Sequence, residues 1–163
     1  MSAPKTVTSL WIERIAEVIS SARHGRGLFV ALGAYRLDLV RVMADELDLQ
    51  FFDFRNEILQ PLGWDAGRLP LAALSEEIET RRKARSLVVH NAEALLATKA
   101  AADRKQWFAQ FANQDWKRPV IIPLAIYQNE LPVLSGQLVL IETHELPSEC
   151  LLLLLAGKRM VLL

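Results

Sequence analysis

The sequence predicts a three-layer α/β domain, with a mostly parallel β-sheet covered by helices on both faces. Segments with helical periodicity alternate with short apolar runs along most of the chain. These runs are continuously apolar rather than alternating, which is typical of parallel strands buried on both faces. The 163 residues, 52% of them hydrophobic, suffice for one domain with its own core. Because we find no internal repeat or linker, we expect a single domain over residues 1–163.

The first half of the chain supplies two helices and two strands. Apolar residues from Trp11 to Ala22 recur at helical spacing and predict a helix over residues 8–23. A buried strand follows over residues 28–32 and ends at Gly33. A second amphipathic helix begins near Arg36, and residues 49–54 form the next predicted strand.

The second half begins with residues 55–70, which contain two prolines and two glycines and indicate a loop with at most short structure. The elements predicted after it are a helix over 71–85, a strand over 87–90, a segment over 92–97, a helix over 104–116, strands over 120–126 and 137–142, and short late strands over 151–155 and 160–163. Pro123 within its strand predicts a bulge or an end position.

Composition excludes several classes of protein. The 19 basic and 19 acidic residues give no net charge, so nothing global favours nucleic-acid binding. The single cysteine, Cys150, cannot form an internal disulfide, and no His, Cys and Asp spacing resembles a metal site. Residues 1–5 lack the apolar core of a signal peptide, and the longest apolar run, 151–156, is too short to span a membrane. We therefore expect a cytoplasmic protein without membrane contacts.

The turn over residues 33–36 occupies the place of a phosphate-binding loop, between a strand and a helix. Such a loop needs several glycines, a lysine for the outer phosphates and a hydroxyl for magnesium. This turn offers only Gly33, with Leu37 and Asp38 where the lysine and the hydroxyl are needed. The strand over 87–90 ends at His90, and imidazole is a poor ligand for magnesium.

Taken together, these segments resemble a degenerate P-loop NTPase of the AAA-like class, and more narrowly the small P-loop proteins of BREX phage-exclusion systems, the BrxF family. The resemblance rests on the helix with Trp11-Ile12-Glu13-Arg14-Ile15, the strand Leu28 to Leu32, the strand Leu87 to Val89 with Asn91-Ala92-Glu93-Ala94-Leu95-Leu96 after it, and the strand Val120 to Ile126 leading to Asn129-Glu130-Leu131-Pro132. The family's phosphate lysine is absent, and its strand-end aspartate corresponds to His90. The resemblance implies a fold and a defence-related setting, and it does not imply hydrolysis.

The resemblance leaves Glu93 as the one carboxylate near the place where such folds activate water. If a nucleotide binds, Gly33, Arg36 and Glu93 are the residues expected to contact ATP and magnesium. Because the phosphate-binding lysine and the magnesium-binding aspartate are absent, we expect no catalytic residue and no cofactor. The sequence therefore favours a protein that is not an enzyme.

Two surface features suggest binding partners. Trp64, in a loop rich in proline and glycine, is either an interface anchor or a cap on the sheet edge. The basic residues Arg81, Arg82, Lys83 and Arg85 either contact DNA phosphates or form a solvated helix end.

The sequence therefore predicts a non-catalytic structural or regulatory subunit of a larger complex, of a BREX-like phage-defence kind. We expect it to contact a larger protein through the loop around Trp64 and one edge of the sheet, and self-association is a further expectation. The alternatives are an ATP-binding subunit with a non-consensus phosphate site and a DNA-binding accessory module.

Overall fold

A computed structural model describes residues 7–21, 25–134 and 136–145. Within these ranges, five parallel strands form one sheet: β1 (Gly27–Ala31), β2 (Gln50–Asp53), β3 (Leu87–His90), β4 (Val120–Leu124) and β5 (Leu138–Leu140). Their order is β2-β3-β4-β1-β5, so β4 lies between the strand before the turn and the strand that ends at His90. The α/β class and the parallel sheet predicted from the sequence are confirmed.

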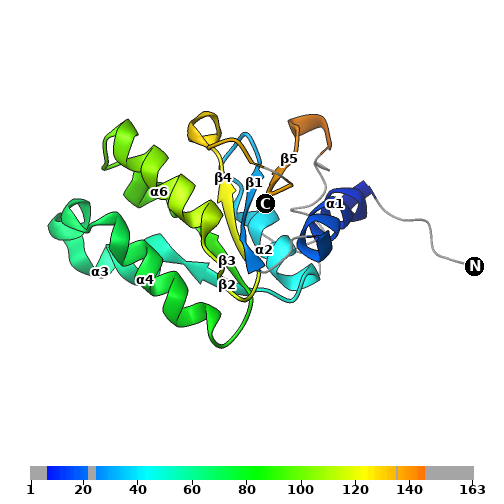
Figure 1. The fold of residues 1–163 in the computed structure, drawn as a ribbon. Helices are drawn as coiled ribbons and strands as arrows, with labels where there is room; N and C mark the ends of the chain where they lie inside the picture. Colours follow the sequence, from blue (N-terminus) through cyan, green and yellow to red (C-terminus); the bar gives the residue numbers. More distant parts are fainter. Residues whose placement is uncertain (1–6, 22–24, 135, 146–163) are drawn as a thin grey trace, which may run out of the picture.

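Helices cover both faces of this sheet (Figure 1). One face carries α4 (Leu71–Arg82), α5 (Glu93–Leu96) and α6 (Ala101–Asn113), and the other carries α1 (Val7–Ser21) and α2 (Leu37–Glu46). The remaining elements are short: η2 (Arg55–Leu59), α3 (Gln60–Leu62), η3 (Gly63–Arg68), η4 (Gln128–Glu130) and η5 (Thr143–Glu145).

The core consists of two apolar clusters, one on each face of the sheet. Strand β1 shows the division, because Phe29 packs with α6 whereas Leu28 and Val30 pack with α1 and α2. Successive side chains of a strand point to opposite faces, so a strand between two helical layers is buried along its length and is mostly apolar. All residues of β1, β3 and β4 are buried accordingly.

Most predicted elements are present, with ends shifted by a few residues. Pro123 is the second-last residue of β4, and the pairing of β4 with β3 ends at Ile121. The proline therefore stands near the strand end, where its missing N–H interrupts no ladder bond between β3 and β4. The region 55–70 is more ordered than predicted, since η2, α3 and η3 follow one another without a gap and Pro61 lies in the first turn of α3.

The predicted strands over 151–155 and 160–163, and Cys150, lie outside the described residues. In the part of the chain that the structure describes, no helix combines the length and the apolar character needed to cross a bilayer.

Candidate functional site

The carboxyl ends of the parallel strands meet at one edge of the sheet, where open α/β sheets bind their ligands. Four sequence-predicted positions lie there: Gly33 and Arg36 in the turn after β1, His90 at the end of β3, and Glu93 at the start of α5. Gly33 adopts a φ of +68°, a conformation that glycine accepts without strain. The fold thus brings the residues of the candidate phosphate site together.

Arg36 is bound to an aspartate two residues further along the chain. Its Nε and Nη2 donate to the two carboxylate oxygens of Asp38 at 3.0 and 2.8 Å. The hydrogen bond from Arg36 lowers the pKa of Asp38, while partial burial opposes this effect. Because a bidentate pair of this kind uses the guanidinium edge that would hold a phosphate, the arginine is already occupied by an acid.

His90 is buried beneath Tyr35. Only 2% of His90 is exposed, whereas Tyr35 is 58% exposed, and a hydrogen bond of 2.8 Å joins the Tyr35 hydroxyl to His90 Nε2. The Phe51 ring stacks on the imidazole with centroids 5.5 Å apart. Burial lowers the pKa of His90; the nearby Asp53 carboxylate opposes this shift and Arg41 adds to it. His90 is therefore a buried histidine whose Nε2 is bonded to a tyrosine hydroxyl.

Glu93 accepts hydrogen bonds from three successive backbone N–H groups. Its carboxylate oxygens lie 2.6, 2.8 and 2.9 Å from the nitrogens of Ala125, Ile126 and Tyr127, which follow β4. The side chain is buried. This carboxylate thus fastens the segment after β4 to the start of α5, and its acceptor sites are directed at the backbone.

Little space remains between these groups. The cavity that Tyr35, Arg36, His90 and Glu93 help to line measures about 20 Å³. That is room for about one water molecule, whereas pockets that hold small ligands measure about 300–1,000 Å³. The cavity is therefore much smaller than the pockets that hold small ligands. Within the described residues, no cluster of three or more His, Cys, Asp and Glu side chains could hold a metal ion.

The basic run at the end of α4 is largely engaged in ion pairs. Arg81 contacts Glu77 at 2.6 Å and lies over the Phe52 ring, Arg82 pairs with Glu79, and Arg85 contacts Asp48 at 2.7 Å. Lys83 is exposed. These contacts agree with the helix-end interpretation that the sequence left open beside the DNA-binding one.

Trp64 is completely exposed, at 103% of the reference surface, on η3. It covers no part of the sheet, so the alternative that it caps the sheet edge is wrong. Trp11 and Trp107 are buried, as their helical spacing predicts.

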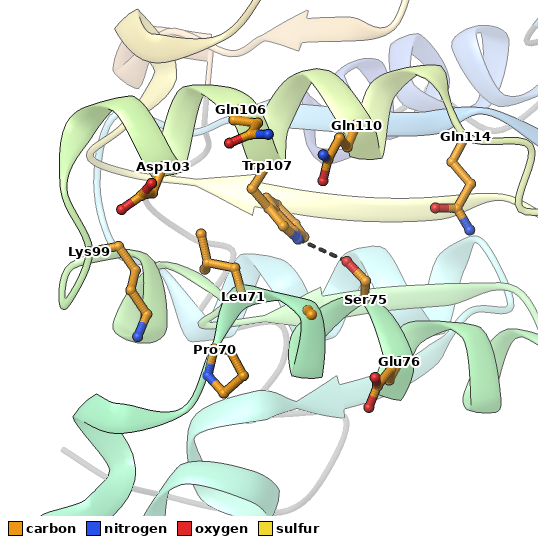
Figure 2. Close-up of a pocket in the computed structure, with 11 residues that line it drawn as sticks. Pro70, Leu71, Ser75, Glu76, Lys99, Asp103, Gln106, Trp107, Gln110 and Gln114 are labelled. Atoms are coloured by element: carbon orange, nitrogen blue, oxygen red, sulfur yellow. Dashed lines mark hydrogen bonds between the residues drawn. The ribbon is translucent and has the colours of Figure 1, made fainter.

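Sequence reasoning missed a groove between α4 and α6, with a volume of about 620 Å³ (Figure 2). Its floor is Trp107, whose indole N–H donates to the Ser75 hydroxyl at 2.9 Å. One wall carries the amides of Gln106, Gln110 and Gln114. The available signal was the spacing of Gln106 and Gln110, because residues i and i+4 of a helix share a face; Gln114 follows the end of α6.

The chain matches no protein-family model, no curated protein and no solved structure.

Proposed function

We propose that this protein is a non-catalytic subunit of a larger complex, in which a P-loop-like fold serves for protein binding rather than for nucleotide chemistry. The observation that carries the proposal is the closed turn at the carboxyl edge of the sheet. Tyr35 covers His90 there, and the remaining cavity of about 20 Å³ is far smaller than a nucleotide.

The chemistry of the individual residues supports the same conclusion. Arg36 is paired with Asp38, and the Glu93 carboxylate is bonded to three backbone N–H groups. A residue that activates water needs an oxygen directed at the water, and one that binds phosphate needs an unpaired donor. These two residues have structural partners instead.

The described fold is compatible with the resemblance to P-loop domains, because its sheet is parallel, helices cover both faces, and the turn after β1 lies at the carboxyl edge of the sheet. This likeness concerns the fold, and function must be argued from the site. The assignment to phage defence rests on the resemblance to the BrxF family alone.

The contacts expected with a larger subunit are Trp64 and an outer strand of the sheet. In the described sheet β5 is an outermost strand, and Leu140 on it is exposed. Exposed aromatic and aliphatic side chains held on ordered backbone are common anchors of protein interfaces.

A thermal-shift titration with ATP, ADP and GTP, with and without magnesium, tests this proposal. A ligand that binds only the native state raises the free energy of unfolding by about 2.7 kcal/mol at a concentration of 100 Kd. We expect no shift at millimolar nucleotide. A magnesium-dependent shift that disappears in Arg36→Ala would contradict the proposal and favour the alternative of a non-consensus ATP site.

A further inference from the structure

A separate cavity lies at the carboxyl edge of the sheet, beside the ends of β2 and β3. Its volume is about 480 Å³, within the range of about 300–1,000 Å³ that is usual for pockets of small ligands. The two strands are neighbours that end together at Asp53 and His90, η2 follows β2 directly, and α5 follows β3 closely. The cavity between η2, α3, η3 and α5 is lined by Arg55, Asn56, Leu59, Gln60, Ala66 and Ala94.

Arg55 is the one charged residue among these six. It is exposed, and it forms no ion pair within the part of the chain that the structure describes. The nearest acidic residues in the sequence have other partners. The Asp53 carboxylate accepts hydrogen bonds from the backbone and side-chain nitrogens of Asn56, at 3.1 and 3.0 Å. The Glu57 carboxylate accepts one from the Asp53 N–H group at 2.9 Å and lies 3.7 Å from Arg81. The Arg55 guanidinium can therefore bind an anion without displacing a carboxylate of its own chain.

The turn that carries Arg55 is fixed before any ligand binds. Residues 55–59 form a single π-helical turn, a rare form of helix that occurs frequently at functional sites. The hydrogen bonds among Asp53, Asn56 and Glu57 close the start of this turn, and Leu59 at its end is buried. A site held in this way loses little conformational freedom when a ligand binds, which favours affinity.

The remaining lining indicates the kind of molecule that the cavity suits. Leu59, Ala66 and Ala94 form an apolar part that packs on the core, and the amides of Asn56 and Gln60 add hydrogen-bonding groups. Pockets of small ligands combine such an apolar lining with a few polar groups. One guanidinium matches one negative charge, and its two parallel N–H groups match the two oxygens of a carboxylate.

We infer that this cavity binds a small organic carboxylate, with the Arg55 guanidinium on the carboxylate group and Leu59 and Ala94 against the apolar body. The cavity is larger than one acidic side chain requires, so its volume favours a whole small molecule. It shares no lining residue with the small cavity at the closed turn. The inference therefore goes beyond the proposed function and does not depend on it.

Heteronuclear NMR titrations of the isotope-labelled full chain test this site. The probes are acetate, benzoate and phenylacetate at neutral pH and constant ionic strength, each compared with its uncharged amide. We expect the carboxylates to produce saturable shifts in the backbone signals of residues 55–60, 66 and 94, with a Kd in the millimolar range or below. The amides should bind at least about tenfold more weakly, because they lack the charge that Arg55 recognises.

Three variants separate the contributions of charge and volume. Arg55→Gln removes the charge and should weaken benzoate binding at least about tenfold. Ala94→Leu fills the cavity but keeps the guanidinium, so it should weaken benzoate binding more than acetate binding. The matched control is Arg68→Gln, which removes an exposed charge from η3 outside the cavity and should leave both affinities unchanged. Thermal unfolding checks the fold of each variant, and Ala66→Leu is the second filling variant if Ala94→Leu is unstable.

The inference is overturned if no carboxylate shifts these signals, if the uncharged amides bind equally well, or if Arg55→Gln binds benzoate as the parent chain does. Tighter binding of inorganic phosphate than of every carboxylate would overturn the assigned class of ligand. None of these results changes the outcome expected from the nucleotide titration with Arg36→Ala, which tests the proposed function. The two failures are therefore distinguishable.

Discussion

The carboxylate of Glu93 holds three consecutive backbone N–H groups, those of Ala125, Ile126 and Tyr127. Hydrogen bonds to a charged acceptor contribute more than neutral ones, and a buried N–H group left without a partner is costly. We expect Glu93→Gln to lower the free energy of unfolding by about 2–4 kcal/mol, measured by urea denaturation. The control Glu46→Gln removes an exposed carboxylate from the last turn of α2 and should change stability by less than about 0.5 kcal/mol. Equal stability of the two variants would show that the Glu93 contacts contribute little.

His90 should make stability depend on pH. Its pKa in the fold lies below that of an exposed histidine, about 6.5, chiefly because the imidazole is buried. As pH falls below about 6.5, the unfolded chain binds a proton that folded His90 does not, so stability decreases until folded His90 also becomes protonated. Urea denaturation between about pH 7.5 and about pH 5.5 measures this decrease.

Two variants identify the source of that pH dependence. His90→Phe keeps an aromatic ring against Phe51 but cannot titrate, so the decrease in stability with falling pH should be smaller. Tyr35→Phe removes the hydrogen bond, at a cost of about 1 kcal/mol, but leaves the histidine buried under a ring, and the decrease should persist. An unchanged pH dependence in His90→Phe would show that other groups cause it.

At the residue scale, the sequence located these positions but could not assign their partners. His90 was identifiable because a polar residue at the end of an apolar strand is unusual, and Glu93 was identified through the resemblance to P-loop domains. Their partners, Tyr35 and residues 125–127, lie 55 and more than 30 positions away in the chain. Only the parallel sheet brings these segments to one edge, so the closed turn could not be predicted.

At the scale of elements, strand β1 and helix α6 meet where β1 has no side chain. A Cβ atom at Gly27 would overlap the ring of Phe111. That ring cannot easily move, because Phe29, Trp107 and Trp116 surround it with centroids 5.2–5.4 Å away.

We expect Gly27→Ala to lower the free energy of unfolding by about 1–3 kcal/mol through overpacking, measured by urea denaturation. Gly67→Ala is the matched control, because its nearest neighbour, the Thr98 methyl group, would lie at an ordinary 3.9 Å. If Gly27→Ala were as stable as this control, the packing between β1 and α6 would be looser than the structure indicates.

Periodicity predicted the long helices and buried strands because each carries its own apolar pattern. It did not predict the short helices over 55–68. Pro61, Gly63 and Gly67 are residue types that are typical of loops. Proline is nevertheless accepted in the first turn of a helix, and Gly63 takes a positive φ where α3 ends and η3 begins. The order of the strands in the sheet could not be predicted either, since nothing in the sequence of a parallel strand specifies its neighbour.

At the scale of the whole molecule, the distribution of charge favours our proposal of a protein partner over a DNA partner. The 19 basic residues balance 19 acidic ones, and the arginines of the basic run hold carboxylates of the same chain. A phosphate approaching Arg81 or Arg82 must displace Glu77 or Glu79, and these carboxylates also repel it. Productive DNA binding would require several such exchanges at once, because affinity for DNA comes from many phosphate contacts.

We therefore expect no measurable binding of duplex or single-stranded DNA at low salt, measured by fluorescence anisotropy with labelled oligonucleotides. The double variant Glu77→Gln and Glu79→Gln removes the nearest carboxylates from Arg81 and Arg82 and should produce weak, salt-sensitive binding, which confirms that the assay detects this surface. Binding by the parent chain that falls steeply with salt and is lost in Lys83→Ala with Arg85→Ala would contradict this expectation. The basic run would then be a DNA contact, and the ion pairs that the structure places there would have to open when DNA binds.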